Sequence, residues 1–219
     1  MEYILEKPIW TEVDFDKMNW HDVTIYEMAM TGDLELDIDY IFKSNEPAVK
    51  GFRFTFWIAP CTFVFKQIRE LRFDMDVVRS DGFQIDYIER SGHNWTIITR
   101  NGDISFISDG FEMFVRQQPT LQYQKLIGIE RGGYTLERVT DQPNQYLQTE
   151  GYIEKRKKDA ELFGYAQKRK QKKLDMEALE ERRLNGEIDT TEFLRLKKEL
   201  LMAIDGYGYW LKGTMFEDA

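Results

Sequence analysis

The sequence is poor in the features that mark secreted and membrane-spanning proteins. Cys61 is the only cysteine among 219 residues, so no internal disulfide can form, and it lies in an apolar run. A lone cysteine in such surroundings fits a packing role in a reducing compartment. No apolar run reaches the roughly 18 residues of a membrane span, and no basic start precedes an apolar stretch as in a signal peptide. We therefore expect a cytoplasmic protein without membrane attachment.

Proline and catalytic motifs are scarce as well. The chain has five prolines, whereas aromatic residues make up 14% of it, which favours an ordered, sheet-rich protein over a disordered one. No Gly-x-Ser-x-Gly nucleophile motif, phosphate-binding loop or glycine-rich dinucleotide fingerprint occurs. We predict no cofactor and no metal centre.

The net charge of -9 is distributed unevenly along the chain. Residues 1–150 contain 15 basic and 25 acidic residues, whereas residues 151–219 contain 15 and 14. An acidic surface repels phosphate backbones, so nucleic acid is an improbable partner for the first part, and a basic protein is a better one.

Alternating apolar and polar residues predict strands through most of the first 140 residues. Residues 34–42 alternate strictly except at Ile41, and Gly32-Asp33 suits a two-residue turn, so residues 20–43 form a predicted β-hairpin in which Ile25 faces Tyr40. Asn101-Gly102 predicts a second hairpin. Further strands are predicted at 52–58, 61–65, 71–77 and 83–88, and a break at Pro60 separates the first two. A third hairpin is predicted from strands 121–129 and 134–139 with its turn at Arg131-Gly132-Gly133. A turn is predicted at residues 80–82.

The first 145 residues therefore read as one antiparallel β domain. Strands recur at intervals of about ten residues without helical patterns between them. Residues 1–19 form a short edge strand or coil, and residues 110–118 fit a strand or a helical turn equally. The predicted fold class is mainly β, an antiparallel sandwich or partly open barrel, with a C-terminal α-helical hairpin extension over residues 150–219.

The extension begins with a long helix of segregated charge. Nearly every residue from 152 to 184 is a good helix former, but residues 167–173 have no apolar side chain to bury. Nine basic and two acidic residues lie between 155 and 173, and two basic and seven acidic residues lie between 174 and 193. A basic helix can bind nucleic-acid phosphates or an anionic membrane. We favour pairing with the protein's own acidic domain or with an antiparallel copy of the helix.

A second helix should follow at once. Asn185-Gly186 predicts a helix end, and Asp189 with Glu192 predicts the cap of a helix that runs through Ile204. The tail at 206–211 is too aromatic to remain free and is expected to pack back. We expect this extension to mediate self-association or to bind a separate protein. The residues assigned to partner binding are Lys168, Arg169, Lys170, Lys172, Lys173, Leu174, Leu179 and Leu184.

The candidate catalytic residues lie on the 20–43 hairpin. The predicted turn sets Asp22 opposite Lys43 and gathers polar side chains on one face. Clustered carboxylates bind hard cations, and a histidine beside an aspartate can act as a base. The simpler interpretation is a solvated hairpin face, on which Asp37→Asn would change stability little. The candidates are His21, Asp22, Asp37 and Asp39.

Six segments stand out in the β-rich part of the chain: Trp20-His21-Asp22, 36–41, 56–65, 95–106, Arg116-Gln117-Gln118-Pro119 and Arg131-Gly132-Gly133. Together they resemble a family of uncharacterised bacterial cytoplasmic proteins with no assigned activity. The resemblance covers about residues 14–134 and implies a bacterial origin and a β-rich unit, but no catalytic residue. Residues 179–200 also resemble short C-terminal helical hairpins of some bacterial proteins, which implies association.

We therefore predict a non-enzymatic binding protein, an immunity-type or regulatory partner with an acidic β domain. The alternative is a metal-dependent or acid/base hydrolase that uses the His21, Asp22, Asp37 and Asp39 face. Metal content of the purified protein would distinguish the two.

Overall fold

The computed structural model describes residues 3–75, 83–125, 127–202 and 207–218, and it divides into two compact units. The first, called the β unit, comprises Met1–Asn45 and Phe54–Leu147. The second, called the helical unit, comprises Glu46–Arg53 and Gln148–Ala219. The predicted class, mainly β with a C-terminal helical region, is confirmed. The turn predicted at residues 80–82 lies outside the described residues.

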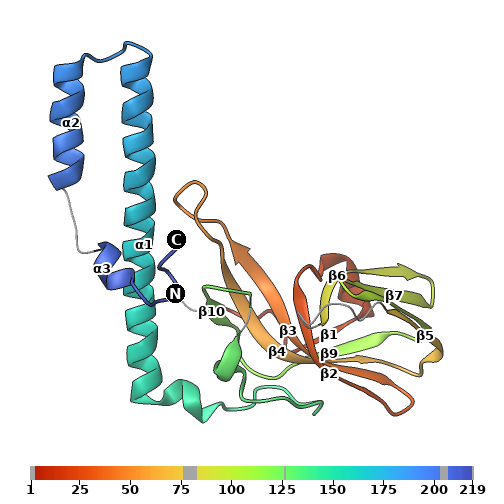
Figure 1. The fold of residues 1–219 in the computed structure, drawn as a ribbon. Helices are drawn as coiled ribbons and strands as arrows, with labels where there is room; N and C mark the ends of the chain where they lie inside the picture. The colour runs from red at the N-terminus through yellow and green to blue at the C-terminus, as the bar shows by residue number, and fades with distance from the viewer. Residues whose placement is uncertain (1–2, 76–82, 126, 203–206, 219) are drawn as a thin grey trace. The chain divides into compact units, whose positions relative to one another are not determined.

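Ten strands of the described residues form one antiparallel sheet in the β unit (Figure 1). The strand order is β1-β9-β4-β3-β2-β6-β7-β8-β5, with β10 paired to β4. Within the described part of the chain, β1 and β5 end this order, so the sheet is open. The strands are β1 Ile9–Thr11, β2 Val23–Met30, β3 Leu34–Asn45, β4 Thr55–Phe65, β5 Arg69–Met75, β6 Phe83–Ser91, β7 Asn94–Thr99, β8 Gly102–Ile107, β9 Phe111–Val115 and β10 Thr120–Gln122.

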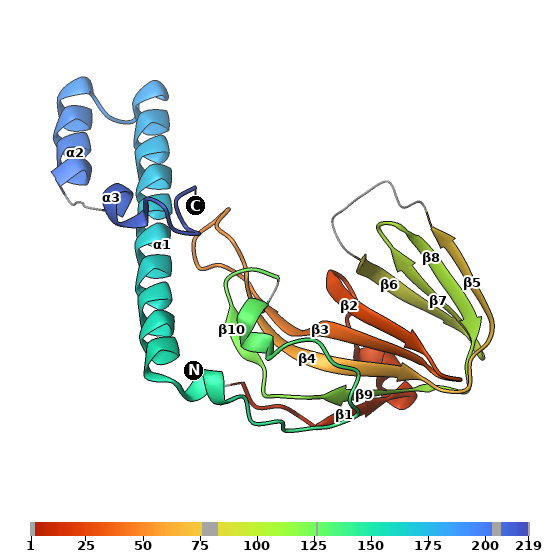
Figure 2. The ribbon, with the colours of Figure 1, turned by 60° about the horizontal axis from the view of Figure 1, so that its bottom comes forward.

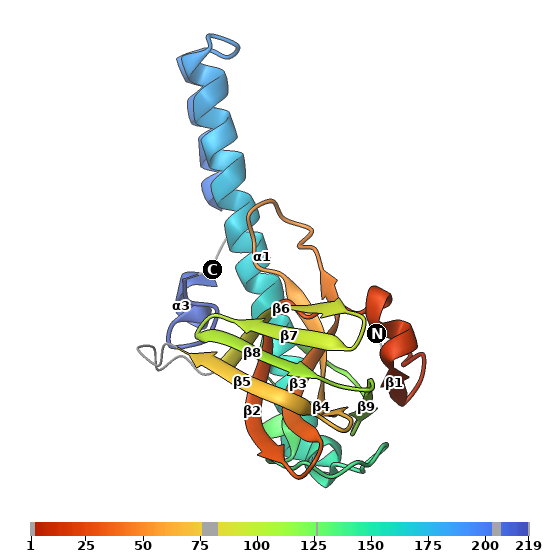
Figure 3. The same ribbon diagram turned by 90° about the vertical axis from the view of Figure 1, so that its right-hand side faces the viewer.

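The main apolar core lies between two parts of this sheet. Figure 3 shows β6, β7 and β8 in front of β3 and β4. Phe65 on β4 contacts Trp95 on β7, with ring centroids 5.2 Å apart, and Phe106 on β8 at 4.6 Å. Cys61 is fully buried in the same core, as its apolar surroundings predict, and burial raises the pKa of its thiol.

The opposite face of β3 and β4 is buried as well. Ile41 packs there against Phe56, Ile58 and Ile127. Because side chains two residues apart lie on the same face of a strand, the exception in the β3 alternation marks a second interior surface. Residues 116–125 and 127–147, called the cover segment, lie over this surface (Figure 2). They include β10, the 3-10 helix η2 (Gly128–Arg131) and the start of η3 (Gln145–Gln148).

The β2–β3 hairpin forms, but not in the predicted register. Met30 pairs with Leu34, so the turn has three residues instead of two. Ile25 lies opposite Ile38 and not Tyr40. A bulge just after Ile25 adds one residue to β2, which shifts the pairing beyond it.

Pro60 does not break the strand, contrary to the prediction. β4 is continuous from Thr55 to Phe65, and Pro60 lies opposite Asp39 on β3. On its other side β4 pairs first with β10, up to Ile58, and then with β9, from Cys61. Proline lacks an N–H, and it occupies the position between these two partners, where its carbonyl accepts from the backbone N–H of Arg116.

The hairpin predicted about Arg131-Gly132-Gly133 is also wrong. Residues 128–131 form η2, and Tyr134 to Val139 have no regular structure. These residues do not pair with each other because they are used to cover β3 and β4. The hydroxyl of Thr62 on β4 donates to the carbonyl of Glu137 at 2.8 Å, which fixes this part of the cover segment.

The other predicted strands overlap observed ones. β4 begins at Thr55, three residues after the predicted start at 52, and β6 covers the predicted 83–88. β5 covers residues 71–75 of the predicted 71–77, and residues 76 and 77 lie outside the described residues.

β7 and β8 form the hairpin at Asn101-Gly102, where Thr99 pairs with Gly102. Gly102 has φ +126°, and a Cβ there would lie 2.1 Å from the carbonyl oxygen of Asp74 on β5, so only glycine fits. Residues 111–115 form a strand, β9, and β1 is a short edge strand followed by the 3-10 helix η1 (Glu12–Lys17).

The helical unit has three helices in its described part: α1 (Glu150–Leu184), α2 (Thr190–Met202) and α3 (Tyr207–Leu211). As predicted, α1 ends at Asn185-Gly186, where Gly186 has φ +74°. The carboxylate of Asp189 accepts from the backbone N–H of Glu192 at 2.8 Å, which caps α2 as predicted. Its expected end at residue 204 lies outside the described residues.

The aromatic tail packs back on α1, as predicted. Tyr165 on α1 contacts Tyr207 and Trp210 of α3, with centroids 5.4 and 4.9 Å apart. The loop between β3 and β4 also packs within the helical unit: Phe52 contacts Phe163 on α1 at 5.3 Å.

Candidate functional site: a buried ionic network

The structure places Asp37 and Asp39 inside the β unit and not on a solvated face. Both side chains are fully buried on β3, on the face that the cover segment encloses. The interpretation of a solvated hairpin face is therefore wrong. An ionised carboxylate in such a place requires opposite charge and hydrogen-bond donors, and the cover segment supplies both.

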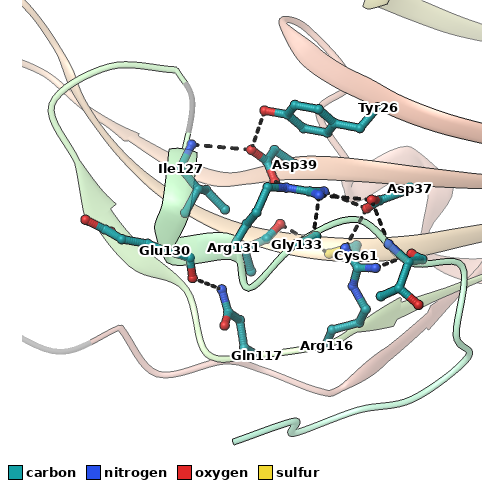
Figure 4. A network of polar contacts seen from close by, with 12 residues as sticks. Tyr26, Asp37, Asp39, Cys61, Arg116, Gln117, Ile127, Glu130, Arg131 and Gly133 are labelled. Atoms are coloured by element: carbon teal, nitrogen blue, oxygen red, sulfur yellow. Dashed lines mark hydrogen bonds and ion pairs between the residues drawn. The ribbon is translucent and has the colours of Figure 1, made fainter. Parts of the chain in front are cut away.

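Asp37 is held by two arginines of the cover segment (Figure 4). Arg116 donates to its Oδ1 at 2.5 Å, and Arg131 donates to its two oxygens at 2.6 and 3.0 Å. The backbone N–H of Thr135 donates to Oδ2 at 3.2 Å. Two guanidinium groups on one carboxylate leave a local excess of positive charge, which a second carboxylate can balance.

Asp39 provides that second carboxylate. Arg131 donates from Nε to its Oδ1 at 3.2 Å, the Tyr26 hydroxyl donates to Oδ2 at 2.8 Å, and the backbone N–H of Ile127 donates to Oδ2 at 3.3 Å. Burial raises the pKa of the Asp39 carboxyl against the opposing effect of Arg131. Burial and the Asp39 charge raise the pKa of Tyr26, so its hydroxyl keeps the proton that it donates.

The Arg131 side chain also lies against aromatic rings. Its guanidinium carbon is 4.0 Å from the ring centroid of Tyr26 and 4.8 Å from that of Tyr134. Burial alone would lower the pKa of Arg131, but the hydrogen bonds that Arg131 donates to Asp37 and the charge of Asp39 outweigh burial and raise this pKa. The two aspartates, the two arginines and Tyr26 are called the ionic network below.

The arginines also satisfy backbone carbonyls of the irregular chain. Arg116 donates to the carbonyl of Thr135, and Arg131 donates to that of Gly133 at 2.6 Å. Beside them, the side-chain amides of Gln117 and Asn144 donate to the carbonyl of Glu130 at 2.9 and 2.7 Å. Buried loops rarely satisfy their own backbone groups, and these side chains do so here. The ionic network thus fastens the cover segment to the sheet.

His21 and Asp22 belong to a different group of contacts. Asp22 has φ +65°, which is uncommon for a residue other than glycine, and its buried carboxylate is 2.8 Å from Arg100, 3.2 Å from Nε2 of His21 and in contact with Lys125. The predicted contact with Lys43 does not form. His21 has 64% of its side chain exposed.

The four candidate catalytic residues are therefore not gathered into one site. Asp37 and Asp39 share Arg131, whereas Asp22 is bound by Arg100 and Lys125. In the described part of the chain no group of three His, Cys, Asp or Glu residues could hold a metal ion. The carboxylates have basic side chains where a metal centre would need oxygen or nitrogen ligands without positive charge.

Sequence reasoning missed Arg116, Arg131 and Tyr26, which complete the network. A signal was present at Ile41: an apolar residue on the same strand face as Asp37 and Asp39 indicates that this face is buried. The sequence does not indicate which cations neutralise the aspartates, because Arg131 lies 94 positions after Asp37.

The predicted partner-binding residues all lie on α1. Leu179 is buried in a small core with Ile188 and Phe193, whereas 79% of Leu184 is exposed. Arg169 donates to the carbonyl of Glu217 at 2.8 Å, and Lys168 lies 6.0 Å from the Tyr165 ring centroid. Leu174, Lys170 and Lys172 are half-buried, and Lys173 is exposed.

Two grooves open on the surface of the helical unit. The first, called the hairpin groove, has a volume of about 440 Å³ between α1 and α2. The second, called the aromatic groove, has a volume of about 570 Å³ and lies between α1 and the segment of α3. The hairpin groove is lined by Asp175, Ala178, Leu179, Arg182, Leu196, Glu199 and Leu200. The aromatic groove is lined by Lys158, Glu161, Leu162, Tyr165, Tyr209, Trp210 and Lys212.

Comparison with known proteins adds no relative. No family model, curated protein or solved structure matches this chain significantly. Among the described residues no helix is both long and apolar enough to cross a membrane. The case for function therefore depends on the geometry of the two units.

Proposed function

We propose that this is a non-enzymatic cytoplasmic interaction protein whose helical unit associates with a second copy of the same chain. The observation that carries the proposal is the hairpin groove. Two helices alone bury only one stripe of each other, and here Leu196 and Leu200 remain half-buried around Leu179. A second hairpin placed on this groove would complete a four-helix arrangement.

The charges around the hairpin groove suit a symmetric partner. Asp175 and Glu199 are acidic, and Arg182 is basic. In a two-fold contact the same surface of each chain meets its copy, so Arg182 of one chain can face the acidic residues of the other.

Burial would provide most of the free energy of association. The apolar side chains that the groove presents to a partner are Ala178, Leu179, Leu196 and Leu200. Covering such side chains is worth about 25 cal/mol per Å². Exposed ion pairs contribute only about 0.2 to 1 kcal/mol each, so salt should weaken the association only partly.

If the protein also has a regulatory or immunity-type role, the β unit would have to bind the partner through residues on its surface. The aspartates at positions 37 and 39 are inside the unit and neutralised, so they offer nothing to a basic partner. A hydrolase that uses these carboxylates is not supported, because each already accepts hydrogen bonds from an arginine. Acidic residues elsewhere on the β unit remain available to a basic protein.

A matched pair of substitutions on α1 tests the association. Ala178→Glu places a charge in the hairpin groove, whereas Ala160→Glu places the same charge at another exposed position of the same helix. Light scattering at micromolar concentration should show a dimer for the natural chain and for Ala160→Glu. Ala178→Glu should be monomeric, with unchanged helical circular dichroism.

Two results would contradict this proposal. A natural chain that is monomeric at low and high salt excludes self-association and leaves a separate protein as the partner. A dimer that survives Ala178→Glu locates the contact outside the hairpin groove.

A further inference from the structure

We propose that the aromatic groove of the helical unit binds single-stranded nucleic acid. This site is distinct from the hairpin groove, since no lining residue is common to both. It also differs from the acidic β unit, whose charge opposes such a ligand.

The groove presents flat aromatic surfaces to solvent. Tyr209 is 82% and Trp210 is 46% exposed, although both are large rings that proteins usually cover. Tyr165 forms the base of this surface: its ring stacks on Tyr207 and contacts Trp210, and its hydroxyl donates to Glu161. These contacts hold the Trp210 ring in place before any ligand arrives. Base stacking on exposed aromatic rings tolerates any sequence, because every base has a flat face.

Basic side chains surround these rings. Lys158 and Lys212 line the groove, and Nζ of Lys168 is 6.0 Å from the Tyr165 centroid. Helical spacing places Arg169 on the same face of α1, four residues after Tyr165. Glu161 is the one acidic residue among those lining the groove, and its carboxylate accepts from Tyr165. The groove therefore combines excess positive charge with stacking surfaces, which is the combination that single strands require.

Other anionic partners fit this surface less well. An anionic membrane calls for a helix with a continuous apolar face, but residues 167–173 of α1 contain no apolar side chain. An acidic peptide would pair with the lysines yet leave the exposed faces of Tyr209 and Trp210 without a flat partner. Of these three partners, a nucleic acid is the one that uses both the cations and the rings.

Fluorescence anisotropy of the full chain with a labelled 15-nucleotide single strand tests the assignment. We expect binding at low salt that weakens steeply as salt is added, because phosphate contacts release counterions. The variant Lys158→Glu with Lys212→Glu should bind at least tenfold more weakly and depend less on salt. Lys43→Glu with Lys198→Glu, a double reversal of exposed charges outside the groove, is the matched control and should bind as the natural chain does.

The stacking contribution is measured separately. Tyr209→Ala should weaken binding by about fivefold or more, because one stacked base is worth roughly 1 kcal/mol or above. Tyr87→Ala, which removes a 49% exposed tyrosine from β6, should leave binding unchanged. Circular dichroism establishes that both variants keep the fold.

Three results would overturn the inference. The first is an absence of binding at low salt. The second is equal loss of binding in the groove variants and in the controls, which would indicate a diffuse charge effect. The third is displacement of the strand by poly-glutamate at equal charge, with Tyr209→Ala unaffected, which would assign the groove to an acidic protein. Because Ala178→Glu leaves the aromatic groove intact, loss of the dimer and loss of nucleic-acid binding are distinguishable.

Discussion

The two units use charge in opposite ways. In the β unit Asp37, Arg116 and Arg131 are almost completely buried, and every one of them contacts opposite charge. In the helical unit pairs such as Arg195 with Glu199 leave about 60% of each side chain exposed. Buried charges must find partners within the fold, so they determine how the chain folds. Exposed charges keep their water and remain available to another molecule.

The largest effect should follow from breaking the ionic network at its centre. Asp37→Asn removes the charge that Arg116 and Arg131 share and leaves both guanidinium groups buried with less opposite charge. The free energy of unfolding should fall by about 3 to 5 kcal/mol. Urea denaturation followed by circular dichroism measures it, and a loss below 1 kcal/mol would support the solvated-face interpretation.

Asp39 and Asp33 should give pH dependences of opposite sign. Burial raises the pKa of Asp39 in the folded chain above the ordinary value of 3.8 that it has in the unfolded chain. The folded state therefore loses stability as the pH rises from 3.8 through the pKa of Asp39 in the folded chain. The N–H of Gln67 and the guanidinium of Arg138 lower the pKa of Asp33, so its contribution is present above 3.8 and is lost as pH falls through the lower folded value. Asp39→Asn should therefore lose less stability relative to the natural chain at pH 7 than at pH 4. Asp33→Asn should lose more stability relative to the natural chain at pH 4 than at pH 2.5, where the natural chain has lost the Asp33 contribution. Equal slopes in the two variants would contradict these assignments.

Asp22→Asn tests a site between the two extremes. The carboxylate of Asp22 is buried, but the side chains of Arg100 and Lys125 are 47% and 43% exposed. Water can therefore solvate these two basic groups when the negative charge of Asp22 is removed. Asparagine tolerates the positive φ of this position. We expect a loss of about 1 kcal/mol in chemical denaturation, and a loss as large as that of Asp37→Asn would place Asp22 in the same class as the ionic network.

The smallest effect should come from the helical unit. Arg195→Ala removes an exposed pair one helical turn apart, worth about 0.3 to 0.5 kcal/mol. Thermal unfolding should barely change. A large destabilisation would show that exposed charges of this unit carry its fold, which would remove the contrast with the β unit.

Local patterns predicted the elements, and contacts between distant residues decided the rest. The helix end at Asn185-Gly186 and the hairpin at Asn101-Gly102 depend on neighbouring residues, which is why the sequence revealed them. Whether Asp37 is buried or exposed depends on Arg131, which lies 94 positions later, and on a cover segment without regular periodicity. The strand break predicted at Pro60 was wrong because a strand accepts proline only where no neighbouring strand needs its N–H. Which strands flank β4 cannot be inferred from the residues around Pro60.

Contacts of the β3–β4 loop determine which of the two units can finish folding first during synthesis. Arg53 donates to the carbonyl of Met215 at 3.0 Å, 162 positions later, and its guanidinium lies 5.6 Å from the Phe216 ring centroid. This loop leaves the ribosome long before its partners exist. The strands on either side of the loop pair with segments that precede residue 123, whereas the helical unit stays incomplete until Met215 and Phe216 have been synthesised. Its grooves can therefore be finished only after the whole sheet has been translated.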